Sequence, residues 1–354
     1  MIIPYRGYGT TTKLFLRGHV LDDRLLYESR HDDKRKKNFL AMMSRYVSEG
    51  IPDIRVEISF QGQEHVVVTD KDGLFEAEIN LEAPAKQGWQ KVTYQVLDEI
   101  VERQEPLENE GEVFINDQKN QFAIVSDVDD TILISHATQA LKKLRLILTK
   151  NSKTRLPFVG VASFYKALQT GNPSDNCNPI FYVSSSEWNL YDFLEDFCDV
   201  RNIPKGPFLL QELKTSLWKL MKSGGGTHSH KKDKVLHLME VYPNQKFILI
   251  GDSGQRDAEL YQSIAEQYPD RILSIYIRDV SKEKHTEKVN ALASTLNENI
   301  DMLLVADSYS AAKHAYDNGY ITADELGRVQ EEFESQETKP KSLVGQAVTP
   351  NNSD

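Results

Sequence analysis

Hydrophobic and polar residues alternate with a period of two in several segments of the first hundred residues. These segments are rich in β-branched and aromatic residues and cover positions 13–21, 54–60, 65–69, 74–81 and 91–97. Such alternation is typical of strands with one buried face. Asp72-Gly73, between two of them, predicts a hairpin turn that needs positive φ. We therefore predict a small antiparallel β-sandwich domain over residues 1–118.

One helical segment interrupts these strands. Between Lys37 and Val47 the apolar residues recur at helical spacing, which predicts a helical insertion near residues 37–47 with one apolar face. The preceding run of basic residues, 34–37, is either a solvated surface loop, which we favour, or a membrane contact.

The pattern changes at about residue 119. Apolar strand-like segments at residues 121–127, 179–186, 246–252 and 272–279 now alternate with helical patterns. This order predicts an α/β domain over residues 119–335 with a doubly wound parallel sheet. Ligands bind such sheets outside the carboxyl ends of the strands, and these ends carry Asp127, Ser184, Asp252 and Arg278. For Arg278 a salt bridge with Asp279 or another acid is the alternative to a role near a bound ligand.

The range 136–175 reads as a basic helical insert in this domain. From His136 to Arg155 it has six basic residues and no acid, and four aliphatic residues can share one helical face. Such a helix can lie on an anionic membrane surface, or it can pack its leucines on the core and solvate its lysines. Both interpretations stay open. Residues 336–354 have few large apolar residues and predict a disordered tail.

Composition narrows the class of protein. The formal charge of −11 disfavours nucleic acid as a partner. The chain has no run of 18 apolar residues and no basic-then-apolar start, so we expect neither a transmembrane helix nor a signal peptide. Its two cysteines, Cys177 and Cys198, give no disulfide framework. We therefore expect a cytoplasmic location.

The strand at residues 121–127 runs directly into closely spaced acids. Asp127, Asp129 and Thr131 form a D-x-D-x-T motif, and Asp252 and Asp257 lie in the stretch GDSGQRD. Phosphoryl transfer explains these residue types: one carboxylate attacks phosphorus, a second moves the proton, and Mg²⁺ offsets the negative charge. A lysine and a serine hydroxyl would bind the phosphate oxygens.

Other uses of these residues fit less well. A calcium loop that starts at Asp127 needs glycine at its sixth position, where Ile132 stands. A receiver domain would not supply both acidic motifs. Asp130 is expected to be a solvated neighbour or helix cap. His228 and His230 lack a further ligand at useful spacing, so we interpret them as loop residues.

The ordered motifs resemble those of the haloacid dehalogenase superfamily of phosphohydrolases. The stretches DVDDTI, YVSSSEWNLY, GDSGQRDAELY, IYIRDV and the opening PYRGYG also resemble the phosphatidate phosphatase family typified by the yeast actin-patch-associated protein. The resemblance extends to about residue 325. One departure is Glu187, where the family often has proline, which places a further negative charge near the expected phosphate pocket.

This resemblance implies a role for each matching residue. Asp127 is the nucleophile and Asp129 the acid/base. Ser184 and Lys231 are phosphate contacts. Beyond what the resemblance implies, we also assign Thr131, Ser185 and Arg278 to the substrate. Lys231 is expected in the first turn of a helix, and we interpret Lys232 and Lys234 as its solvated face. The metal site comprises Asp127, Asp129, Asp252 and Asp257, with Asp129 binding through its backbone carbonyl. Asp257 is either a ligand or a partner of one.

The resemblance thus implies a Mg²⁺-dependent phosphatase that removes phosphate from a phosphatidate-like lipid at an anionic membrane surface. Two alternatives remain. The same machinery could act on a soluble phosphomonoester or phosphoprotein, since fold and motifs do not choose substrates. In the other, the α/β part is a scaffold and the β-rich part a binding module, although a scaffold has no reason to retain three repelling acids.

Overall fold

The structure is a computed structural model of the 354-residue chain. It describes residues 1–22, 49–102, 105–128, 160–171, 177–211, 227–253, 256–279, 284–297 and 299–337. Within these ranges no helix has the length and apolarity needed to cross a membrane. The predicted helix near 37–47, the basic stretches 34–37 and 136–155, and residues 338–354 of the predicted tail all lie outside the described ranges.

The N-terminal strands form a mostly antiparallel sheet in the order β1-β3-β2-β8-β7-β4-β5, with β6 also paired to β3. Only the β2–β8 pair is parallel. Alternate residues of these strands point into one hydrophobic cluster, as the period of two predicts. The strands are β1 (Ile2–Pro4), β2 (Gly7–Gly9), β3 (Lys13–Val20), β4 (Arg55–Phe60), β5 (Gln63–Val68), β6 (Leu74–Asn80), β7 (Gly88–Val96) and β8 (Leu107–Ile115).

The turn predicted at Asp72-Gly73 is present, but the hairpin is not. Gly73 has a φ of 76° and its N–H donates to the carbonyl of Asp70 at 2.9 Å. However, β5 pairs with β4, and β6 pairs with β3. The prediction of a hairpin was therefore wrong: the turn carries the chain from one strand pair to another.

The second sheet has six strands, all parallel, in the order β11-β10-β9-β12-β13-β14. The chain enters at β9, which lies inside the sheet, and builds outward first to one edge and then to the other. The predicted α/β class with a parallel sheet is thereby confirmed. The strands are β9 (Ala123–Asp127), β10 (Ile180–Glu187), β11 (Phe208–Gln211), β12 (Phe247–Asp252), β13 (Ile272–Arg278) and β14 (Asp301–Val305).

Helices cover both faces of the parallel sheet. One face packs against α3 (Val161–Thr170), α4 (Tyr191–Val200), α9 (Ser308–Asp317) and α10 (Ala323–Glu337). The other packs against α6 (Thr227–Val241), α7 (Asp257–Gln267) and α8 (Lys284–Ala293). Neighbouring strand residues alternate between the faces: Ile124 belongs to the first cluster and Val125 to the second. Helix α3, which falls inside the range predicted as an insert, is thus part of the first helical layer.

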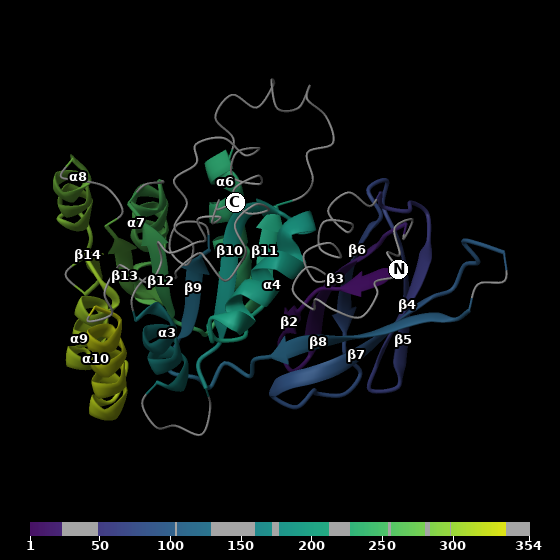
Figure 1. Ribbon diagram of the computed structural model, residues 1–354, viewed down its shortest axis with the longest axis horizontal. Helices are drawn as coiled ribbons and strands as arrows, with labels where there is room; N and C mark the ends of the chain where they lie inside the picture. The colour runs from purple at the N-terminus through teal and green to yellow at the C-terminus, as the bar shows by residue number, and fades with distance from the viewer. Residues whose placement is uncertain are drawn as a thin grey trace, which may run out of the picture.

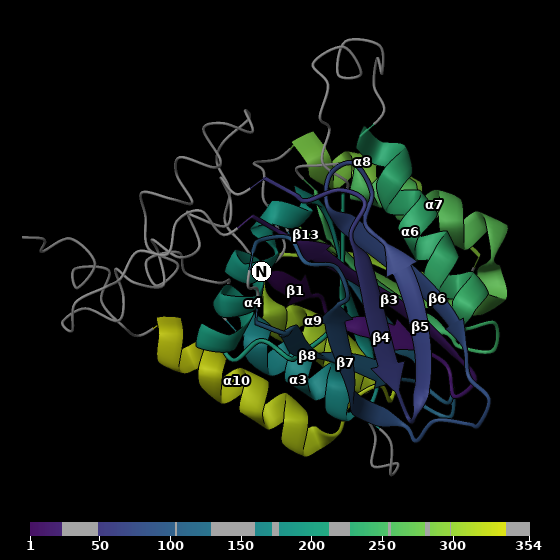
Figure 2. The same cartoon turned by 90° about the vertical axis from the view of Figure 1, so that its right-hand side faces the viewer.

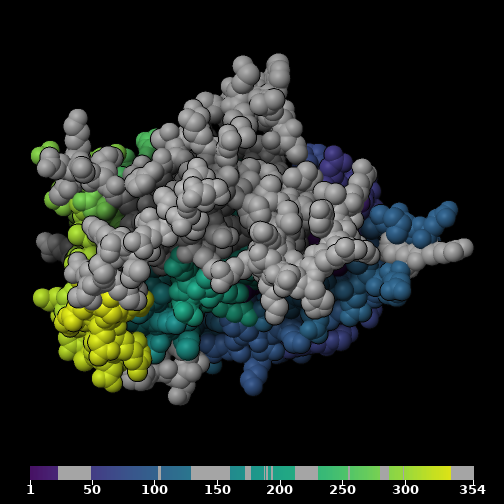
Figure 3. Space-filling view, in the orientation of Figure 1, coloured from purple at the N-terminus to yellow at the C-terminus, as the bar shows by residue number. Residues whose placement is uncertain are grey.

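The two sheets lie side by side, with β2 and β3 near β10 and β11 (Figure 1). The antiparallel sheet and α10 occupy opposite ends of the molecule, as the space-filling view also shows (Figure 3). The view from the side of the antiparallel sheet places β3 and β6 in front of α6 (Figure 2). Direct contacts join the parts: the Tyr5 and Trp188 rings stack with centroids 4.6 Å apart, and the Tyr242 hydroxyl donates to the Gly9 carbonyl at 3.2 Å.

Candidate active site

The carboxyl edge of the parallel sheet brings four of the predicted residues together. Strand register places Asp127 beside Val183, the residue before Ser184, and places Asp252 beside Arg278. Strands β9 and β12 are buried along their full lengths, so their closing carboxylates lie at the end of an apolar sheet. The carboxylates of Asp127 and Asp252 are fully buried.

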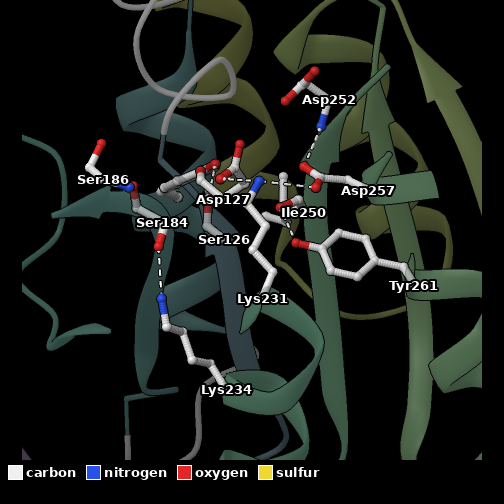
Figure 4. A network of polar contacts seen from close by, with 11 residues as sticks. Ser126, Asp127, Ser184, Ser186, Lys231, Lys234, Ile250, Asp252, Asp257 and Tyr261 are labelled. Carbon is white, nitrogen blue, oxygen red and sulfur yellow. Dashed lines mark hydrogen bonds and ion pairs between the residues drawn. The ribbon is translucent and has the colours of Figure 1, made fainter. Parts of the chain in front are cut away.

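Lys231 is the central cation of this site. Its ammonium Nζ lies 2.8 Å from Oδ1 of Asp127 and 3.0 Å from Oδ1 of Asp257 (Figure 4). The exposed fractions of these three side chains are 2%, 0% and 1%. Sharing one lysine offsets part of the repulsion between the two carboxylates, which in a buried site is large. Lys231 is the fifth residue of α6 rather than a residue of its first turn. His228 and His230 also lie in α6, so their interpretation as loop residues was wrong.

Asp257 connects Lys231 to the end of β12 through its two carboxylate oxygens. Its Oδ2 accepts a hydrogen bond from the backbone N–H of Asp252 at 3.3 Å, while its Oδ1 contacts Lys231. Gly251 makes that approach possible, because a Cβ there would lie 2.7 Å from Cβ of Asp257 and 2.8 Å from Cε2 of Tyr261. Asp257 therefore orients both Lys231 and the backbone that carries Asp252.

Three of these acids could hold a metal ion. One carboxylate oxygen from each of Asp127, Asp252 and Asp257 lies within 4.8 Å of the others, and all three residues are buried. Carboxylate oxygens are ligands of hard divalent cations. Three carboxylates against the positive charges of Lys231 and Arg278 still leave an excess of negative charge, which a divalent cation would offset. The donor set of the described residues therefore fits a metal such as Mg²⁺.

Arg278 adds a second cation at the same edge. Burial lowers the pKa of its guanidinium to about 9, while nearby Tyr165, Asp252 and Asp307 oppose that shift. Arg278 therefore stays charged at neutral pH. Its backbone carbonyl accepts from the N–H of Ser253, which continues the contact between β13 and the end of β12.

The serine segment, residues 184–186, is held by a hydrogen bond within it and by a contact with α6. The Ser184 hydroxyl accepts from the N–H of Ser186 at 2.9 Å, and the Ser184 carbonyl accepts from Nζ of Lys234 at 2.9 Å. Ser185, between them, is partly exposed. Lys234 was interpreted as part of a solvated helix face, and this was wrong: it is half-buried and contacts the serine segment (Figure 4). The sequence did hold a signal for this contact: Lys234 lies three residues after Lys231, and residues at that spacing are neighbours on a helix surface.

Ser126 and Tyr165 support the backbone of Asp127. The Ser126 hydroxyl donates to the carbonyl of Asp127 at 2.8 Å and lies 2.7 Å from the Tyr165 hydroxyl. Burial raises the pKa of Tyr165, so it stays a neutral hydroxyl. Neither residue was predicted, because a serine within a strand and a tyrosine on a helix carry no motif. Asp129 and Thr131, predicted as acid/base and substrate contact, and the side chain of Glu187 lie outside the described positions.

Comparison with known proteins finds a family that is similar to the part of the chain that carries this edge. Residues 122–279 match the family described as the catalytic domain of phosphatidate phosphatase APP1. Phosphatidate phosphatase APP1 of Saccharomyces cerevisiae is 29% identical over 173 residues, covering 48% of this chain and 28% of that protein. An uncharacterized protein of Schizosaccharomyces pombe is 27% identical over 184 residues, covering 49% of this chain and 29% of its own length. The chain thus matches less than a third of either relative.

Solved structures resemble the chain only weakly. A carbohydrate acetylesterase from Xanthomonas citri has a TM-score of 0.28 at 10% identity, covering 86% of this chain and 68% of its own. A β-glucuronidase from Bacteroides uniformis has a TM-score of 0.25 at 8% identity, covering 85% and 38%. Neither value supports an inference about this protein.

Proposed function

Because residues 122–279 belong to the family of the APP1 phosphatidate phosphatase catalytic domain, we propose that this protein is a Mg²⁺-dependent phosphatidate phosphatase. Its α/β part would be of the haloacid dehalogenase type. The reaction removes phosphate from a phosphatidate-like lipid and leaves diacylglycerol.

A single observation carries the proposal: buried Lys231 contacts both Asp127 and Asp257, with Asp252 within metal-binding range of the same acids. A lysine at this point holds the carboxylate of Asp127 in place, and it offers positive charge to the incoming phosphate. A purely structural sheet would not need three carboxylates at its carboxyl edge, because each costs free energy to bury.

The chain's own residues account for the two halves of the reaction. A carboxylate oxygen of Asp127 attacks phosphorus, the bond from phosphorus to the lipid oxygen breaks, and Asp129 gives its proton to the leaving alkoxide. Asp129 then takes a proton from water as the water oxygen attacks the aspartyl-phosphate. Inorganic phosphate leaves and Asp127 is regenerated. Ser184, Ser185, Thr131 and Arg278 are the proposed phosphate contacts.

Asp127, Asp252 and Asp257, together with Asp129, would hold Mg²⁺. When bound, the ion neutralises charge on the phosphate and on the carboxylates. The polar contacts of Asp257 with Lys231 and with the N–H of Asp252 suit it equally to orienting the other ligands.

A lipid substrate requires the protein to reach a membrane surface. We propose a cytoplasmic protein that binds anionic membranes peripherally, with residues 1–118 and 119–335 as its two domains. The basic stretch 136–155 is the candidate membrane contact.

The direct test is phosphate release from vesicles that contain phosphatidate, with Mg²⁺ present. We expect release by the wild type and a loss of about a thousandfold or more in Asp127→Asn, the usual scale for losing a nucleophile. Asp317→Asn, an exposed acid on α9, should behave as wild type. Wild-type release no greater than that of Asp127→Asn would show that the proposal is wrong.

The metal is tested separately from activity. Mg²⁺ at about ten times its Kd should raise the free energy of unfolding by about 1.4 kcal/mol, because it binds only the folded state. The gain should shrink in Asp252→Asn and persist in Asp317→Asn. An equal gain in all three proteins would contradict the assignment of Asp252 as a ligand.

A further inference from the structure

A cleft of about 1230 Å³ lies between the two sheets. One wall is built from strands β2, β3 and β6 of the antiparallel sheet. The opposite wall is built from β11, from Trp188 and from α6. The cleft lies beside the candidate active site, and residues that bind phosphate do not by themselves require so large a space.

Helix α6 joins the cleft to the active site. Lys231 points from this helix to Asp127, whereas His230, Lys234 and His237 line the cleft. The spacing of four and then three residues places these three on one helical face, next to the face that carries Lys231. Lys234 also contacts the Ser184 carbonyl at 2.9 Å, so it stands where the cleft meets the phosphate-binding segment.

One wall of the cleft is aromatic. The rings of Tyr8 and Phe15 stack with centroids 5.4 Å apart, and His237 meets them edge-on at 6.1 Å and 5.2 Å. Burial lowers the pKa of His237, which keeps the imidazole neutral at neutral pH. Leu209 and Leu210 lie on the opposite wall. Such surfaces are suited to alkyl chains rather than to a charged group.

Acidic and basic side chains nearly balance in the cleft lining, and two pairs of them are in contact. Arg17 contacts Glu76, and Lys71 contacts Asp72. Glu78 contacts Lys13 beside the cleft, and Asp70 accepts hydrogen bonds from the backbone N–H groups of Asp72 and Leu74. Asp233, Arg6 and Lys234 also line the cleft, so its five acids face four lysine and arginine residues. Because the opposite charges nearly balance, this lining favours a ligand body without net charge.

We propose that the cleft binds the uncharged, diacylglycerol-like part of the substrate while its phosphate passes Lys234 to reach Asp127. This inference rests on the proposed function and assigns a binding site to the lipid part of its substrate. The volume supports it, since pockets of about 300–1,000 Å³ already enclose a drug-sized molecule and a small leaving group would leave most of this cleft to water.

Binding of the neutral lipid alone gives the first test. Calorimetry with 1,2-dihexanoylglycerol, below its micellar concentration and without metal, should show saturable binding to the full chain. Phe15→Ser and His237→Glu should each weaken binding about tenfold. Tyr316→Ser, an aromatic change on the exposed surface of α9, should leave it unchanged. No binding by the wild type, or equal affinity in all four proteins, would overturn the inference.

Kinetics give the second test. For dihexanoyl phosphatidate relative to p-nitrophenyl phosphate, the ratio of kcat/KM values should fall about tenfold in Phe15→Ser and stay constant in Tyr316→Ser. An unchanged ratio would overturn the inference, and so would hydrolysis of a phosphopeptide by a protein that does not bind dihexanoylglycerol.

The two proposals fail in different ways. A wild type that binds dihexanoylglycerol but releases phosphate from no substrate would overturn the proposed function and support the cleft as a neutral-lipid site. Phosphate release from phosphatidate without any binding of dihexanoylglycerol would support the function and overturn the cleft assignment.

Discussion

At the scale of single residues, Lys231 stabilises two buried carboxylates and is also part of the proposed active site. Replacing it by methionine leaves Asp127 and Asp257 buried without their shared cation, and breaking such pairs costs about 3–5 kcal/mol. We expect urea denaturation of Lys231→Met to show a loss on this scale. Lys232→Met, the half-buried neighbour on the same helix, should change stability by less than about 0.5 kcal/mol. Equal losses would mean that Lys231 does not stabilise the acids.

Gly251 gives a second residue-level prediction. A methyl group at this position would press on Asp257 and Tyr261, so Gly251→Ala should cost about 1–3 kcal/mol and lower phosphatase activity by moving Asp257 away from Lys231. Gly327 in α10 is the matched control, because nothing lies within 4 Å of its Cβ position. Gly327→Ala should instead stabilise the helix by about 0.5–1 kcal/mol. Thermal unfolding and phosphate release should be measured for both variants. A Gly251→Ala protein as stable and active as the wild type would contradict the prediction.

The strand-end acids could be predicted from sequence, but the orientation of their partners could not. Asp127 and Asp252 each close an apolar run, so their place at the sheet edge follows from strand direction. Lys231, Lys232 and Lys234 are chemically alike, and only the phase of α6 against the sheet separates the buried one from those that face elsewhere. That phase is set by Val235 and Leu238 packing in the core, which a local motif does not encode.

At the scale of elements, the predicted strands are those with a clear pattern of their own. β1, β2, β8, β11 and β14 were not predicted. β2 is only Gly-Tyr-Gly, and the first half of β8 is acidic, so neither shows apolar alternation. These strands form because neighbours pair with them, as β7 does along the whole of β8. Tertiary pairing, which outweighs local propensity in sheets, explains why they were missed.

The contact between β10 and the antiparallel sheet leads to a prediction about substrate affinity. Trp188 follows β10 directly and contacts both the Tyr5 ring, at 4.6 Å between centroids, and the Arg17 guanidinium, at 4.7 Å from its ring centroid. This stack fixes the end of the segment that begins at Ser184. Trp188→Leu should therefore raise KM for a phosphomonoester several-fold as well as lower stability, since small displacements of binding groups cost affinity.

Trp89 is the control for this contact. It lies on β7, and Nζ of Lys205 lies 4.3 Å from its ring centroid, so it too joins the two parts by a cation–π contact. Trp89→Leu should lower the melting temperature by a similar amount with KM unchanged. If both variants shift KM alike, the stack on Trp188 has no special role in positioning the serine segment.

At the scale of the whole molecule, the hydrophobic clusters cross the boundary predicted at residues 118 and 119. Tyr5 and Leu74, from the antiparallel part, belong to the cluster that contains α3 and α4 of the α/β part. Tyr8 packs on the cluster of the other face. The backbone N–H of Arg6 donates to the Tyr191 hydroxyl at 2.9 Å, and its side chain pairs with Glu195 at 2.9 Å. The strands thus cover part of the α/β core rather than merely preceding it.

This shared core predicts that the α/β part is not independent. A chain beginning at residue 119 would expose Trp188, Tyr191 and Tyr242. Exposing one large side chain that is normally buried lowers the free energy of unfolding by about 1.5–3 kcal/mol. The sum of several kcal/mol is comparable to the 5–15 kcal/mol that keeps a domain folded. We expect residues 119–354 to bind a hydrophobic dye and to melt well below the full chain, and addition of a separate fragment 1–118 should raise the melting temperature again. A fragment that melts with the full chain, without the added strands, would show instead that the boundary at residue 118 separates two autonomous domains.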